Sequence, residues 1–174
     1  MNFYKRLITI IIVSLLNISL AQSEEQIVYL DLDNIVSNTK AGKLIISNLE
    51  KSKKKTLAKF EKKEKELKKI ESDINKQKNI LSEEELKKKL VEFRKEINIF
   101  QTDRQNVINQ FNKKKVEEFN NFFKKITPII QSYVSEKNFD IVLDRKNIFV
   151  ASKKKDITQE IIKLIDSKIK WLTN

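Results

Sequence analysis

The sequence of 174 residues contains no cysteine, no histidine, one glycine and one proline. Without cysteine and histidine the chain cannot form a disulfide, a zinc finger or a nucleophile pair of the Ser-His-Asp or Cys-His kind. A single glycine argues against Gly-rich phosphate loops, dinucleotide-binding turns and β-sandwiches built on tight hairpins. The composition therefore predicts a mostly helical protein that is not an enzyme and needs no metal or cofactor.

The N-terminus has the pattern of an export signal. Two basic residues precede an apolar run at residues 7–16 (LITIIIVSLL), and small residues follow it. We expect cleavage between Ala21 and Gln22, so that residues 1–21 form a signal peptide. The alternative is a retained membrane anchor, although the strongly apolar run has only about half of the ~20 residues that span a bilayer.

Two long stretches with heptad-like apolar spacing follow. Within residues 43–80 the seam positions from Ile46 to Ile74 are separated by steps of 3, 4, 7 or 8, and in residues 86–111 the steps alternate between 4 and 3, with steps of 3 and 4 again in residues 119–133. Arg104 interrupts the second stripe, and an eight-residue step later forms a stutter. Stripes this narrow are typical of coiled-coil seams.

A capping signature separates the two stretches. Ser82 is followed three residues later by Glu85, which predicts a helix start and a chain reversal near residue 82. The two helices would then form an antiparallel hairpin, the arm, over residues 43–137. At 1.5 Å per residue they would be roughly 60 and 80 Å long, longer than a compact domain of this size needs. Pro128 should kink the return helix or mark where it enters the rest of the protein.

The two ends of the chain, residues 22–42 and 138–174, are predicted to form a β-rich body at the root of the arm. Short β-branched and aromatic segments predict three strands: IVYLDL (residues 27–32), FDIVLD (139–144) and IFVA (148–151). The predicted fold is thus mainly α, with a long antiparallel coiled-coil helical hairpin projecting from a small β-sheet oligomerisation base.

Helices should complete the body. A short helix is expected at residues 34–39, with Gly42 in its joint to the arm, and a second capping box of Asp156 and Gln159 should open a C-terminal amphipathic helix. Because side chains alternate along a strand, one face of FDIVLD is expected to be buried: Phe139, Ile141 and Leu143.

A body of this size is expected to assemble with further copies. Domains below about 70 residues bury too little apolar surface to be stable easily on their own. We therefore expect a homo-oligomer held together through the body. The densest apolar set of the body supplies the expected oligomerisation residues: Leu30, Ile141, Leu143, Ile161 and Ile165.

The order of these elements resembles the Skp/OmpH family of periplasmic chaperones. The resemblance rests on the export signal, the segment YLDLDNIVSN, the long charged hairpin, FDIVLD, and the helix start KDIT at residues 155–158. It implies a periplasmic homotrimer whose arms enclose a cavity that holds unfolded outer-membrane β-barrel proteins without ATP. The basic residues that contact lipopolysaccharide in the family cannot be transferred to this Lys-rich arm, so contact with anionic lipid or lipopolysaccharide stays open.

The net charge of +12 is concentrated on the arm. Residues 43–115 hold 22 Lys and Arg against 12 Asp and Glu, whereas the rest of the chain after residue 21 is neutral. A long surface of one sign attracts acidic partners at a distance and holds them weakly, although a plain solvated helix surface would show the same charge runs. The candidate client-binding residues are the lysine clusters: Lys53, Lys54, Lys55, Lys62, Lys63, Lys87, Lys88, Lys89, Lys113, Lys114 and Lys115.

Other classes of partner fit the sequence less well. Nucleic acid is not expected, because the chain lacks an Arg-dense, base-reading region and the export signal separates it from nucleic acid. A membrane-tethered coiled-coil spacer of the cell envelope, with its signal retained, is the remaining alternative. Phenylalanines on the seams, such as Phe60 and Phe111, are expected to pack the coiled coil and to meet clients only where seam edges are exposed.

Overall fold

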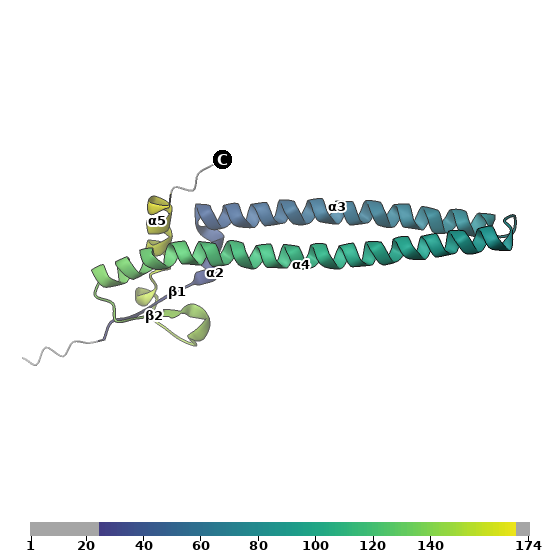
Figure 1. Cartoon of the computed structure of the whole chain (residues 1–174). Coiled ribbons are helices and arrows are strands. Elements are labelled where there is room, and N and C mark those ends of the chain that lie inside the picture. The colour runs from purple at the N-terminus through teal and green to yellow at the C-terminus, as the bar shows by residue number, and fades with distance from the viewer. Residues whose placement is uncertain (1–24, 170–174) are drawn as a thin grey trace, which may run out of the picture.

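The computed structural model describes residues 25–169, and it shows a long helical hairpin joined at its root to a small body (Figure 1). Within this range no helix is both long and apolar enough to cross a membrane. The expected signal peptide and its cleavage site at Ala21 and Gln22 lie outside the described residues.

Two helices form the antiparallel arm, as the apolar spacing predicts. Helix α3 spans Lys40–Gln77 and helix α4 spans Glu83–Glu136. The capping box at the tip is confirmed, since the Ser82 hydroxyl accepts from the Glu85 amide and the Glu85 carboxylate accepts from the Ser82 amide at 3.1 Å. Acidic side chains in the first turn of α4 also interact favourably with the helix dipole.

The capping box gives the tip a pH dependence. Hydrogen bonds from the Ser82 hydroxyl and then the Ser82 amide lower the pKa of the Glu85 carboxyl. A lowered folded-state pKa means that the stabilisation is present above the usual glutamate pKa of about 4.3 and is lost as pH falls through the folded value.

We expect Ser82→Ala to remove about 1 kcal/mol from the stability of the first turn of α4. Amide hydrogen exchange, corrected for intrinsic rates, should show this as lost protection at neutral pH. The parent chain should lose the same protection on acidification, and the variant should respond much less. Equal acid responses in the two proteins would contradict the capping assignment.

Aromatic packing sets the register of the middle of the arm. The rings of Phe60 and Phe100 meet edge to face with their centroids 6.0 Å apart. Arg104, which interrupts the apolar stripe, lies 5.9 Å from the Phe60 ring and pairs with Glu64 of α3 at 3.3 Å. A cation over an aromatic face is attracted to it, so the arginine is accommodated at the seam without being buried.

The body is built on two parallel strands. Strand β1 (Ile27–Leu30) pairs with β2 (Ile141–Asp144), with Ile27 opposite Ile141. Parallel strands need a long crossover connection. Here the crossover is the whole arm together with helix α2 (Leu32–Asn38), so pairing of the two chain ends closes the hairpin at its root.

The third predicted strand is wrong. Residues 148–151 form a bend between two short 3-10 turns, η1 (Arg145–Asn147) and η2 (Lys153–Lys155). The edge of β1 away from β2 is met by the next segment of chain instead, where the Ile157 amide donates to the Tyr29 carbonyl at 2.9 Å. After β2 the chain enters η1, whose first turn is capped by the Asp144 side chain accepting from the Lys146 amide, and the IFVA segment pairs with neither described strand.

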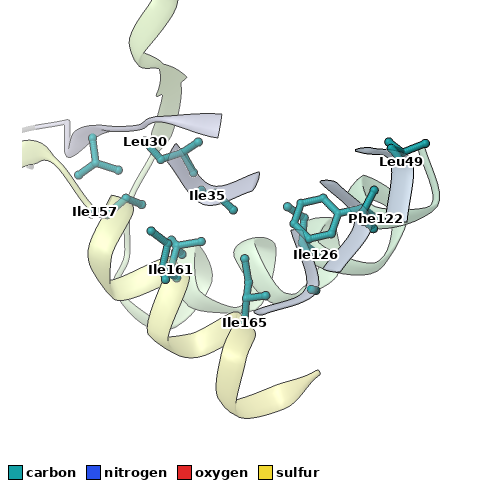
Figure 2. Close-up of a cluster of buried hydrophobic side chains, with 12 residues drawn as sticks. Leu30, Ile35, Leu49, Phe122, Ile126, Ile157, Ile161 and Ile165 are labelled. Atoms are coloured by element: carbon teal, nitrogen blue, oxygen red, sulfur yellow. The ribbon is translucent and has the colours of Figure 1, made fainter. Parts of the chain in front are cut away.

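Helices cover the inner face of the sheet and share one core with the root of the arm. Helix α5 (Thr158–Lys168) packs against α2 and α4, and Figure 2 shows side chains from all of these elements converging. The core contains Val28, Leu30, Ile35, Ala41, Ile45, Leu49, Phe122, Ile126, Ile157, Ile161, Ile162 and Ile165. Pro128 lies in the part of α4 just beyond these core residues, where the helix runs through the body and continues to Glu136.

Two local predictions for the body are corrected. Val142 packs against the core, whereas Ile141 and Leu143 are 42% and 41% exposed. The register explains this, because Val142 pairs with the buried Val28 and therefore faces the helices. The second capping box is absent: the Asp156 carboxylate accepts from the amide and hydroxyl of Thr158, and α5 begins without a side-chain cap.

Gly42 lies at a tight corner between α2 and α3. Thr39 is both the C-cap of α2 and the N-cap of α3, and its hydroxyl accepts a hydrogen bond from the Gly42 amide at 3.1 Å. The backbone of Val36 lies so close that a Cβ on residue 42 would be 1.8 Å from the Val36 carbonyl oxygen. The close approach of two backbones therefore requires the single glycine of the chain.

Candidate functional site

The predicted lysine clusters line the surface of the arm. Ten of the eleven lysines are exposed, and Lys63 is half-buried. The antiparallel course of the helices brings Lys53 of α3 and Lys115 of α4 to the same hollow near the root, while residues 87–89 lie near the tip. The sequence clusters are therefore distributed along the arm, and they do not converge on one point.

Few of these lysines are neutralised. Lys63 pairs with Glu96 across the arm at 3.1 Å and with Glu66 at 3.9 Å, and Lys113 is 4.0 Å from Glu117. Among residues 25–169 the other nine lysines of the set form no ion pair. Residues 43–115 hold 22 Lys and Arg against 12 Asp and Glu, so the arm retains a strongly positive surface.

An apolar groove on the same arm was not predicted. It consists of a hollow of about 300 Å³ and a neighbouring one of about 230 Å³, which share Lys53 and Phe111. Its apolar lining comes from both helices: Ile46, Leu49, Leu57, Phe60, Val107, Ile108, Phe111 and Phe119. The sequence signal for it is the pair of small polar residues at positions 52 and 56 of α3, where the seam spacing calls for large apolar side chains.

The tip of the arm has a hollow of a different character. This hollow of about 310 Å³ lies between α3 and α4 and includes three carboxylates beside one lysine: Asp73, Glu92 and Glu96 with Lys89. Positive and apolar character thus coincide in the groove near the root, whereas this hollow at the tip is mainly acidic.

The predicted oligomerisation residues fall into two groups. Leu30, Ile161 and Ile165 are buried in the core of this chain, where a neighbouring copy cannot contact them. Ile141 and Leu143 instead lie on the outer face of the sheet beside Ile27, which is 40% exposed.

Further apolar side chains adjoin this outer face. Phe149 is fully exposed and Val150 is 80% exposed in the bend that follows η1. Tyr29 and this bend line a common hollow of about 320 Å³, which places the bend beside the sheet. We call this surface the outer apolar face, and its members are Ile27, Ile141, Leu143, Phe149 and Val150.

Comparison with known proteins identifies the family. A sequence model described as outer membrane protein (OmpH-like) matches residues 26–165, from β1 to α5. The chain belongs to the OmpH-like family. The predicted family and fold class are confirmed.

A solved structure shares the OmpH-like fold. It is the crystal structure of a Caulobacter crescentus protein described as a candidate outer membrane chaperone (OmpH-like), with a TM-score of 0.77 and 16% sequence identity. The match covers 87% of this chain and 89% of that chain. The sequence matches no curated protein.

Acidic residues of this OmpH-like chain have structural roles in the body. Asp31 caps α2 by accepting from the Asn34 amide at 2.9 Å, and it pairs with Arg145 at 3.6 Å. Asp33 pairs with Lys146 at 2.9 Å, and the hydrogen bond to Asp33 is the main reason that the pKa of Lys146 is raised. Within the described range no group of His, Cys, Asp and Glu side chains could hold a metal ion.

Proposed function

We propose that this OmpH-like protein is a periplasmic, ATP-independent holdase, which binds unfolded outer-membrane β-barrel proteins on its basic arms and prevents their aggregation. The observation that supports the proposal most is the long, exposed and largely unpaired lysine surface of the arm. The description of its Caulobacter crescentus structural neighbour as a candidate outer membrane chaperone supports the same function.

The arm suits a partner without fixed structure. An unfolded β-barrel protein exposes alternating apolar side chains and is often acidic, so a long positive surface attracts it from several directions. At about 0.15 M salt the Debye length is about 8 Å, and the attraction then acts at close approach through many weak contacts. Such contacts hold a flexible chain without imposing one conformation on it.

The outer apolar face supports assembly into a homo-oligomer, for which the family resemblance implies three copies. Monomeric soluble proteins rarely leave a contiguous apolar surface exposed without a partner. A second copy would cover this face and would place several arms side by side around one client. Of the predicted oligomerisation residues, Ile141 and Leu143 are the two that such an interface can use.

Removing arm charge should slow client capture. Lys87, Lys88, Lys89, Lys113, Lys114 and Lys115 are exposed, so replacing all six with glutamine should leave helical content and assembly intact. Stopped-flow measurement with a urea-denatured, acidic β-barrel client should give an association rate at least about tenfold lower at low salt. Raising salt to about 1 M should abolish most of the difference between variant and parent, because the Debye length falls to about 3 Å.

A lysine triplet on the body provides the matched control. Lys153, Lys154 and Lys155 form an exposed run of the same charge and length as each arm triplet. Replacing this body triplet with glutamine should change the association rate much less than replacing residues 87–89 alone. Equal decreases in the association rate for the two triplet variants would mean that the net charge of the protein, and not the arm, controls capture. An unchanged association rate in the six-residue variant would rule out electrostatic capture.

A further inference from the structure

The seam of the arm has a weakly packed section near its root. On α3 none of residues 50–66 is buried, although Leu49 and Leu67 on either side are. On the facing part of α4 Phe111 and Val107 are only half-buried. A coiled coil is stabilised by large apolar side chains at successive seam positions. In this section the run of large side chains is interrupted, because Thr56 lines the groove between the helices.

Apolar side chains at the rim of the groove are left partly exposed. Leu57 of α3 is 47% exposed and Ile108 of α4 is 39% exposed, on opposite walls of the same hollow. Phe60 and Phe111 lie in its lining, so the groove offers aromatic and aliphatic surface to a ligand. The lining spans residues 46–60 of α3, which corresponds to about 21 Å of helix.

The charges around the groove are mainly positive. Lys53, Arg104 and Lys115 line it, and Glu50 is the one carboxylate in its lining. Lys53 and Lys115 form no ion pair within the described residues, so a bound carboxylate can pair with either. The hollow at the tip has the opposite balance, with three carboxylates and one lysine.

We propose that this groove is a docking site for an extended segment of polypeptide in which apolar side chains alternate with carboxylates. An extended chain rises about 3.3 Å per residue, so about six residues fill the groove. Alternate side chains of such a segment point to one face, so the apolar ones enter the groove while the acidic ones stay outside it, where the long, exposed side chains of Lys53 and Lys115 can reach them at the rim. The proposal rests on the holdase function, since unfolded β-barrel strands have this alternation.

A short peptide tests the groove without any aggregating client. The probe is a ten-residue peptide that alternates valine with aspartate and carries a fluorophore on a Gly-Ser linker, and its binding to the full chain is followed by anisotropy. Removing the rim with Leu57→Ser and Ile108→Ser should weaken binding about tenfold or more. The matched control replaces Val91 and Ile99, which are similarly exposed on α4 outside the groove, with serine and should leave affinity unchanged.

Charge specificity separates this site from a general apolar surface. Lys53→Gln with Lys115→Gln should weaken binding of the aspartate peptide, but it should hardly affect a peptide that carries serine in place of aspartate. The control pair Lys54→Gln and Lys114→Gln removes the same charge from neighbouring exposed positions outside the groove lining. Equal effects of the two pairs on the aspartate peptide would overturn the assignment.

Filling the groove gives a test that does not depend on loss of folding. Thr56→Leu should restore seam packing, raise the thermal stability of the arm and abolish peptide binding. Undiminished peptide binding in this stabilised variant would overturn the proposal. Binding of laurate without binding of the peptide would also overturn the proposal, because it would identify an acyl chain as the occupant. A change in the sedimenting mass of the rim variant would overturn it as well, because it would identify a second copy of the chain as the occupant.

The same measurements distinguish the groove from the holdase function. Suppression of client aggregation by a chain that does not bind the peptide would overturn the groove proposal and leave the proposed function standing. Peptide binding by a chain that does not suppress aggregation would overturn the holdase function and leave the groove standing.

Discussion

Replacing Gly42 with alanine should strongly destabilise the body, although alanine is the better helix former. Helix propensity alone would make the substitution stabilising by about 1 kcal/mol. In the folded chain, however, the new Cβ would lie 1.8 Å from the carbonyl oxygen and 2.7 Å from the carbonyl carbon of Val36. These are backbone atoms, so relief requires α2 to move away from α3.

That movement would open the core. Helix α2 contributes the fully buried Ile35, which packs with β1 and α5, and Thr39 is buried at the corner itself. We expect a loss of at least about 3 kcal/mol, the upper part of the range for overpacked sites. Urea unfolding followed by circular dichroism should show it, together with faster amide exchange in α5.

Asn48→Ala is the matched control for Gly42→Ala. It introduces the same residue at an exposed position of the same helix, where helix propensity alone should raise stability by less than about 1 kcal/mol. If Gly42→Ala also proves stabilising, as propensity predicts, then the corner between α2 and α3 is not as tight as described.

The substitution Ile141→Asp should convert the proposed homo-oligomer into folded monomers. Ile141 is 42% exposed and lies outside the core in the single chain, so an aspartate there is tolerated by the chain's own fold. Within an interface formed by the outer apolar face, the same carboxylate would be buried without a partner, at a cost of several kcal/mol. A weakening of association by about 100-fold or more follows.

Analytical ultracentrifugation should detect the smaller mass while circular dichroism shows retained helix. The control is Ile80→Asp, which makes the same chemical change at the tip of the arm, where the side chain is 85% exposed. A parent-like mass for the Ile141→Asp variant would exclude the outer apolar face as the interface.

The sequence predicts the arm well because its determinants are local. Heptad spacing, the Ser82–Glu85 box and the absence of glycine between residues 43 and 137 all act within a few residues of one another, and the structure agrees with each. The groove depends on the opposite kind of information. It forms where Thr56 faces Phe111 and Val107 across the hairpin, and that alignment follows from pairing between residues about 50 apart.

The body was less predictable for the same reason. The composition of IFVA favours a strand, yet a strand also needs a neighbour to pair with: Asp156 and Ile157 meet the outer edge of β1, and the 3-10 turn η1 follows β2 in place of a hairpin turn. The buried face of β2 likewise follows from the parallel register with β1, which a single segment cannot reveal. Leu30, Ile161 and Ile165 are predicted from their apolar character to be oligomerisation residues, but in the structure they lie in this chain's own core.

The central claim is that the basic arm keeps an unfolded β-barrel protein soluble without nucleotide. The most direct measurement is light scattering after a urea-denatured β-barrel client is diluted into nucleotide-free buffer, with and without the chain beginning at residue 22. We expect scattering to be suppressed at near-stoichiometric amounts of the assembled protein, and suppression to weaken as salt is raised. Full client aggregation at a molar excess of folded, assembled protein would contradict the claim.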